Sequence, residues 1–220
     1  MRHWRKNRVC TILVRSKFML DLGNLIPAEI SGTHIAKEIS ERQIRISGSY
    51  RNHRKFNLVL KRFVDEFLFY FGLGLFAGEG TKDGKGTPFE FANSNPKIIG
   101  TVMKLLNQLG IQKSTISPRV QVRIPRSELV DEPVQNLARF WSEYLGIPTG
   151  KFRKPSIRVK EGRGRSDYGT VSIRINSGII GTLFNFWTNQ VLRDNASSFP
   201  DRRMGTGFLA MRRQPGVSRS

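Results

Sequence analysis

The chain has 220 residues, with 37 lysines and arginines against 17 acids, and a formal net charge of +20 at pH 7. This length allows one large or two small domains with a real core, and the charge indicates polyanionic partners. Cys10 is the only cysteine, which excludes an intrachain disulfide and a cysteine zinc site. The apolar runs 9–14 and 67–78 are too short for a secretory signal or a membrane span. We therefore expect an intracellular protein, cytoplasmic or organellar, that is not attached to a membrane.

The positive charge is unevenly distributed along the chain. Residues 1–63 hold 14 lysines and arginines against four acids, and residues 193–220 hold six against two. The ends also lack a clear apolar period. This predicts a basic arm over residues 1–22, a basic disordered tail over 193–220, and a folded part between them.

The first third of the folded part predicts a helix, a strand and a second helix. Pro27 and Glu29 are typical of a helix start, and the helix would continue to Glu38. Polar and apolar residues alternate over 43–48, as in a half-buried strand. The apolar residues between Phe56 and Phe67 fit one face of a helix.

The apolar run 71–80 organises the rest of the chain. If it is helical, Gly74 and Gly78 lie on one face, where another backbone can approach closely. Gly80 would end the helix, with Glu79 just before it. Two interpretations remain open: a buried core helix, or a helix–helix seam that delivers Glu79 to a site at its end.

The later elements have clear boundaries. Asn95 predicts an N-cap and Pro96 the first turn of an amphipathic helix that stops at Gly110. Asp131 and Gly146 bound another helix in the same way. The remaining predicted elements are strands 88–92 and 119–124, a β-hairpin of 155–159 with 169–175, and a helix over 177–192.

Residues 31–66 can be laid over 73–109 as a weak internal repeat. Gly32 then falls under Gly74, Ala36 under Gly78, and Lys37 under the acid at 79. Chance similarity of two such units is the alternative. A true repeat predicts two halves, 23–66 and 67–192, whose small-residue helices pack together through Gly32, Ala36, Gly74 and Gly78.

The segment Gly72-Leu73-Gly74-Leu75-Phe76-Ala77-Gly78-Glu79-Gly80 resembles the LAGLIDADG motif of homing endonucleases. The resemblance implies an α+β fold, in which a mixed or antiparallel sheet forms a saddle with the helices packed on one face, with a pseudo-two-fold axis if the repeat is real. It implies an association with introns or inteins, with a free-standing gene as the alternative, and a nuclease that uses Mg²⁺ to cleave or nick double-stranded DNA at a specific site. Glu79 would be catalytic and, with the backbone carbonyl of Gly78, would bind the metal.

The chain departs from this family pattern in two ways. If 30–38 is a second motif, Lys37 stands where the acid belongs, which predicts a monomer that nicks DNA or only binds it. If it is not, we expect a homodimer with two Glu79 side chains. In addition, a helix follows strand 88–92 directly, as in relatives that serve as DNA-binding modules in regulators. A catalytically inactive regulator and an RNA-binding maturase are therefore the alternatives.

Basic side chains on the predicted strands and loops are the candidates for contact with nucleic acid. The sites are Lys82, Lys85, Arg119, Arg123, Lys151, Arg153, Lys154, Arg158, Lys160, Arg163 and Arg165.

Overall fold

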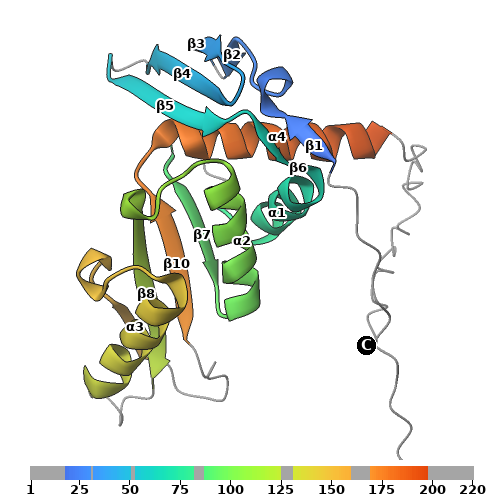
Figure 1. Cartoon of the computed structure of the whole chain (residues 1–220). Helices are drawn as coiled ribbons and strands as arrows, with labels where there is room; N and C mark the ends of the chain where they lie inside the picture. The colour runs from blue at the N-terminus through green and yellow to red at the C-terminus, as the bar shows by residue number, and fades with distance from the viewer. Residues whose placement is uncertain are drawn as a thin grey trace, which may run out of the picture.

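The computed structural model describes residues 18–30, 32–50, 53–81, 87–124, 131–159 and 169–197. These residues form an N-terminal sheet, a small two-stranded sheet, and a larger sheet packed against helices (Figure 1). The predicted α+β class, with a mixed sheet and helices on one face, is confirmed. The predicted arm over 1–22 and the predicted tail over 193–220 lie outside the described residues except for 18–22 and 193–197. There both predictions are wrong, because 19–21 form a strand and 193–197 continue the last helix.

The larger sheet and its helices occupy residues 66–197. The strand order in this sheet is β7-β10-β8-β9, antiparallel except for the parallel pair β8 and β9. The elements are α1 (Glu66–Glu79), β7 (Phe89–Asn93), α2 (Pro96–Gln108), β8 (Ile116–Ile124), α3 (Asp131–Leu145), β9 (Ser156–Val159), β10 (Thr170–Ile175) and α4 (Gly178–Ser197).

Helix starts and stops follow local side-chain chemistry. The Asp65 carboxylate accepts a hydrogen bond from the Leu68 amide at 2.8 Å and caps α1, and the Asn95 side chain accepts one from the Lys97 amide at 2.9 Å and caps α2. Gly110 ends the α2 segment with φ +88°, a conformation that favours glycine. The predicted N-cap at Asn95 is confirmed.

The sheet is apolar on the side that faces the helices. Phe89, Phe91 and Ile173 are fully buried there, and α2 and α3 lie on one side of the sheet (Figure 1). Phe184 of α4 packs edge-on against Phe89, with ring centroids 4.7 Å apart. Gly181 lets α4 approach closely, because an added Cβ would meet the Thr87 carbonyl oxygen. This core fixes α1, α4 and the sheet relative to one another.

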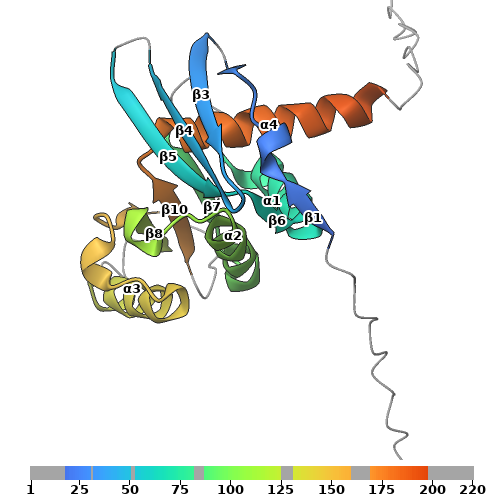
Figure 2. The same cartoon turned by 45° about the horizontal axis from the view of Figure 1, so that its top comes forward.

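The N-terminal sheet replaces the helix expected over 27–38, so that prediction is wrong. Its strands are ordered β2-β3-β4-β5, all antiparallel (Figure 2). Burial alternates along these strands: Ile35, Ile44 and Ile46 are buried on one face, whereas their neighbours in sequence are exposed or, at Ser47, half-buried. The bounds are β2 (Glu29–Ile30), β3 (Thr33–Ile39), β4 (Gln43–Ser49) and β5 (Lys55–Lys61).

The helix expected over 56–67 is also wrong. Lys55–Lys61 pairs with β4, and Phe63–Asp65 forms β6, which pairs with β1 (Met19–Asp21). The apolar residues of 56–60 satisfy both a period of 3.6 and an alternating period, and strand pairing with 43–49 selects the latter. The internal repeat of helix, strand and helix is therefore absent from 32–65.

The predicted hairpin of 155–159 with 169–175 does not form. β10 lies between β7 and β8, whereas β9 runs parallel to the far edge of β8. Burial explains why β10, and not β9, lies in the middle of the sheet. Val171, Ile173 and Ile175 of β10 are buried, as is usual in a central strand, whereas Ile157 of β9 is exposed, as is usual at an edge.

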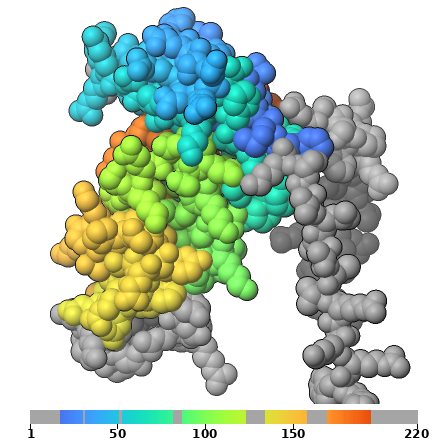
Figure 3. All heavy atoms as spheres, in the orientation of Figure 1, coloured from blue at the N-terminus to red at the C-terminus, as the bar shows by residue number. Residues whose placement is uncertain are grey.

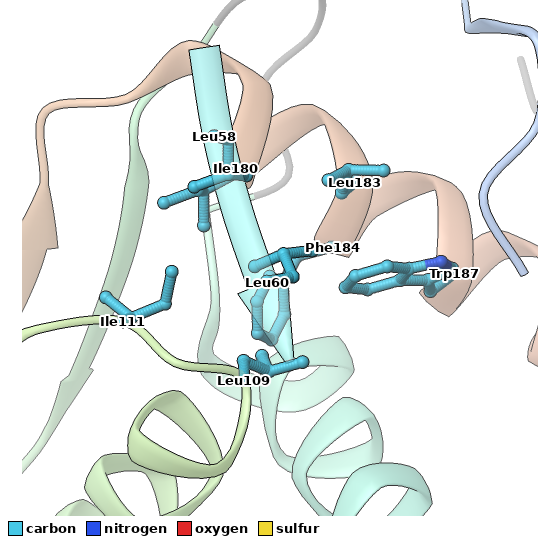
Figure 4. A pocket seen from close by; sticks show the side chains of 8 residues that line it. All are labelled: Leu58, Leu60, Leu109, Ile111, Ile180, Leu183, Phe184 and Trp187. Atoms are coloured by element: carbon cyan, nitrogen blue, oxygen red, sulfur yellow. The ribbon is translucent and has the colours of Figure 1, made fainter. Parts of the chain in front are cut away.

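The N-terminal sheet is joined to the helical part through α4. It lies above α2 and α3 in the space-filling view (Figure 3). The Trp187 indole donates a hydrogen bond to the Leu25 carbonyl at 2.9 Å. A small apolar pocket at this junction shows how β5, α4 and the end of α2 meet (Figure 4). Its lining is Leu58, Leu60, Leu109, Ile111, Ile180, Leu183, Phe184 and Trp187.

Candidate metal-ligand helix and nucleic-acid interface

Helix α1 is apolar on all sides, yet only half of it is covered. Phe69, Leu73 and Phe76 are buried against the core, and α2 and α4 are its helical neighbours. The opposite side carries exposed Phe67 (60%) and Phe71 (48%), whose rings stack with centroids 5.8 Å apart. A helix that is apolar all round is normally enclosed on all sides, so the exposure of Phe71 on this side of α1 is unusual.

The open side continues into the two glycines of the motif. Gly74 and Gly78 are exposed, and a Cβ added at either would meet nothing within 4 Å. Together with Phe67 and Phe71 they form a stripe with the spacing of one helix face, which we call the open face of α1. The predicted closeness of Gly74 and Gly78 to Gly32 and Ala36 is wrong, because Gly32 lies in a turn and Ala36 in β3.

Gly72 is the glycine of α1 that has a close neighbour within the chain. A Cβ there would overlap the Leu105 side chain of α2. This contact sets the approach of α1 and α2. The sequence offered no signal that distinguished Gly72 from Gly74, because both are glycines in the same apolar run.

Glu79 lies at the edge of the larger sheet. The helix ends there, as predicted, with the Gly80 amide donating to the Phe76 carbonyl at 2.8 Å. The chain then pairs briefly with β7, through the bridge of Gly80 with Phe91. Since β7 is the edge strand of the order β7-β10-β8-β9, exposed Glu79 stands where the open face of α1 meets this edge.

Lys37 does not lie across the seam from Glu79, in contrast to the expectation from the repeat. Its ammonium group donates to the carbonyl oxygens of Gly23 at 2.9 Å and Ile26 at 2.8 Å. It therefore connects β3 to the 3₁₀ turn Leu22–Asn24, which follows β1 of the two-stranded sheet.

The donors at the end of α1 suit a hard divalent cation. Magnesium takes oxygen ligands and keeps several waters, and Glu79 supplies an exposed carboxylate. The Gly78 carbonyl belongs to the last helical turn, whose carbonyls lack an intrahelical donor. Among the described residues, His, Cys, Asp and Glu side chains do not gather in a group of three or more that could hold a metal. Among the described residues of α1, Glu79 is the carboxylate at this end of the helix, and a second copy of the chain would bring another.

The sheet side opposite its helices is polar, and we call it the polar sheet face. The register places Glu90 beside Arg174, Ser172 beside Arg119, and Thr170 beside Gln121. All of these alternate with the buried residues that face the helices. Arg119 is therefore where the strand pattern predicted it.

An ion-paired network lies within the polar sheet face. Nη2 of Arg153 donates to Oε1 of Glu90 at 2.9 Å and to Oγ of buried Ser172 at 3.1 Å. The Nη1 atom of Arg174 lies 3.7 Å from Oε2 of Glu90. Burial raises the pKa of Glu90, but the hydrogen bond and charge of Arg153 outweigh it, helped by Ser172 and Arg174, so the pKa lies below its usual value.

The other predicted basic residues are only partly placed. Lys151 and Lys154 are exposed on the segment that leads to β9, and Arg123 is opposite Arg158 in the β8–β9 register. The rest lie outside the described residues, namely Lys82, Lys85, Lys160, Arg163 and Arg165. Sequence reasoning missed Glu90 and Arg174, although strict alternation over 170–175 was a usable signal for the latter.

Comparison with known proteins supports the helix-and-strand part of this site. Residues 66–125 match a family model described as a LAGLIDADG-like domain. Neither the curated proteins nor the solved structures gave a match. No helix within the described residues is long and apolar enough to cross a membrane. The match begins at the first residue of α1 and extends one residue beyond β8, so the segment from α1 to β8 is similar to a LAGLIDADG-like domain.

Proposed function

We propose that this chain is a DNA-binding protein of the LAGLIDADG homing endonuclease type, which cleaves double-stranded DNA with Mg²⁺ and acts as a homodimer. The observation that carries the proposal is the open face of α1, which is apolar, contains Gly74 and Gly78, and ends at Glu79. The match of residues 66–125 to a LAGLIDADG-like domain supports the same assignment.

We infer a homodimer because the N-terminal strands do not place a helix against the open face of α1. Residues 32–65 form strands and supply no helix for this face, which removes the reason for expecting a monomer. A second α1 is the complementary surface that would let two glycine stripes approach closely. A two-fold axis along the seam would place the same patch on both copies, and it would bring two Glu79 carboxylates together.

The metal would be held by the Glu79 carboxylate and the Gly78 carbonyl of each copy. When bound, a divalent cation activates an attacking water and neutralises charge on the leaving oxygen. The residues of the chain supply position: α1 carries Glu79 to the edge of β7, beside the polar sheet face that would contact the duplex.

The polar sheet face provides the charge for DNA. Arg119, Arg153 and Arg174 lie on it against one acid, Glu90. Strands can enter the major groove, where side chains reach base edges. The exposed Lys151 and Lys154 would contact phosphates beside the groove.

The test is strand cleavage of duplex DNA that carries the insertion locus of the gene itself, with and without Mg²⁺. We expect double-strand breaks with wild-type protein and none with Glu79→Gln, whereas Glu38→Gln, on an exposed strand of the N-terminal sheet, should cut normally. Cleavage that persists in Glu79→Gln would overturn the role of Glu79. Clear preference for structured RNA over duplex DNA would instead favour the maturase.

A catalytically inactive DNA-binding regulator is the second candidate. The direct passage from β7 through Asn95 into α2 favours it, because the usual family unit has a further hairpin there. A regulator would bind DNA selectively and with strong salt dependence. Its binding would be unchanged when Mg²⁺ is removed, and no strand would be cut.

A further inference from the structure

Arg119, Arg153 and Arg174 have described side chains on the polar sheet face, and they differ in how many of their donors are already used. Arg153 is more enclosed than Arg174, with 18% against 34% of the side chain exposed, and its Nη2 atom makes two hydrogen bonds within the protein. Its own amide donates to the Pro118 carbonyl at 2.7 Å. Arg153 thus crosses from the segment before β9 to Glu90 on β7, and holds the strands between them.

Arg174 is partly occupied. Its Nε atom donates to the Asn176 side chain at 2.9 Å, and its Nη1 atom lies near the Glu90 carboxylate. The guanidinium therefore has two partners on its own side of the sheet.

Arg119 has no acceptor among the described residues. It is half-buried on β8, next to Ser172 in the register, and the Ser172 hydroxyl accepts a hydrogen bond from Arg153 and none from Arg119. The Nε atoms of Arg119 and Arg153 are both buried without a hydrogen-bond partner, but the guanidinium of Arg153 is held through Nη2, whereas that of Arg119 makes no hydrogen bond to a described residue. An unmet buried donor costs about 1–3 kcal/mol, and it is retained most readily where a ligand supplies the acceptor.

We propose, on the basis of the proposed function, that Arg119 is a specificity-determining residue that reads a guanine in the major groove, and that Arg153 is a positioning residue. The planar fork of arginine matches the O6 and N7 acceptors of guanine. β8 lies two strands in from the edge at β7, about 10 Å away at the usual strand spacing. Arg119 would therefore contact a base pair to one side of the Glu79 pair, and a two-fold dimer would contact two such base pairs.

The experiment is selection of bound sequences from a pool of random duplex DNA, using the full chain without Mg²⁺ so that the DNA is not cut. Wild-type protein should enrich a motif that contains a fixed guanine. Arg119→Gln should enrich the same motif without that guanine, and should bind the wild-type motif about 5- to 150-fold more weakly. Arg119→Lys should keep its affinity for random DNA and lose discrimination at the same base pair. Lys104→Ala removes an exposed charge from α2 and should leave the motif unchanged.

Arg153→Lys provides the contrast. It should lower the melting temperature, because lysine cannot reproduce the contacts to Glu90 and Ser172, and it should retain the guanine in the motif. The proposal is overturned if Arg119→Gln and Arg119→Lys enrich the wild-type motif, if Arg119→Gln weakens binding to all sequences equally, or if Arg153→Lys loses the guanine. If wild-type protein enriches no motif, the proposed function itself has failed.

Discussion

Gly74→Leu should raise the free energy of unfolding of the single chain and weaken the association of two chains. In one chain, a side chain at Gly74 meets nothing within 4 Å, so Gly74→Leu gains only helix propensity, about 0.5–1 kcal/mol. Across a seam of two glycine stripes, the same side chain would have to fit between closely packed helices. Overpacking of that kind costs about 1–3 kcal/mol, which corresponds to about a 5- to 150-fold weaker dimer.

Gly72→Ala is the matched comparison, because its Cβ would overlap the Leu105 side chain inside one chain. The overlap with the Leu105 methyl group costs about 1–3 kcal/mol and the gain in helix propensity returns about 1 kcal/mol, so the free energy of unfolding should fall by at most about 2 kcal/mol rather than rise. Sedimentation equilibrium would measure the dimer, and urea unfolding at a concentration below the dimer dissociation constant would measure the chain. The reasoning fails if Gly74→Leu destabilises the isolated chain, or if the Gly74→Leu protein forms a dimer as tightly as wild type.

Three further substitutions test the parts that position the site. Asp65→Ala removes the N-cap of α1 and should cost about 1 kcal/mol in urea unfolding; an unchanged midpoint would contradict the capping role. The lowered pKa of Glu90 contributes stability that is present above its ordinary value of 4.5 and lost as the pH falls through the folded pKa. Glu90→Gln should therefore be less stable than wild type at neutral pH, and its free energy of unfolding should fall less as the pH is lowered. If the free energies of unfolding of both proteins fall equally with pH, this reasoning is refuted. Lys37→Met removes two hydrogen bonds in the N-terminal sheet and should lower stability by about 1 kcal/mol without altering DNA cleavage; altered cleavage would mean that Lys37 lies near the site.

Local signals in the sequence predicted the LAGLIDADG-like segment well. Asn95 and Pro96 identify the start of α2, and Gly80 the end of α1, through chemistry confined to a few residues. Strict alternation over 119–124 predicted the strand β8 and its polar face. These features depend little on the rest of the fold.

The N-terminal third could not be predicted in the same way. The residues of 27–39 carry helix-start signals at Pro27 and Glu29, yet pairing with β4 makes 33–39 a strand. Tertiary pairing overrides local propensity in such cases. The apparent repeat followed from that error, because Gly32 and Ala36 align with Gly74 and Gly78 only if both segments are helices.

The sequence predicted which residue types form the candidate site, but not which of these residues bond to one another. The Lys37 ammonium binds backbone carbonyls 14 and 11 residues before it, and Arg153 reaches Glu90, 63 residues away. Such contacts arise from the packing of whole sheets. The sequence therefore named Arg119 and Arg153 together, whereas in the structure Arg153 bonds to Glu90 and Ser172 and Arg119 has no acceptor among the described residues.

The mass of the native complex with a selected DNA duplex tests the central claim most directly. The chain has a mass of 25.1 kDa. The proposal predicts two chains on each duplex, about 50 kDa of protein at twice the chain mass, and a single chain per duplex with Gly74→Leu at the same concentration. One wild-type chain on each duplex, at concentrations that saturate the DNA, would contradict the pairing of two α1 helices and two Glu79 carboxylates.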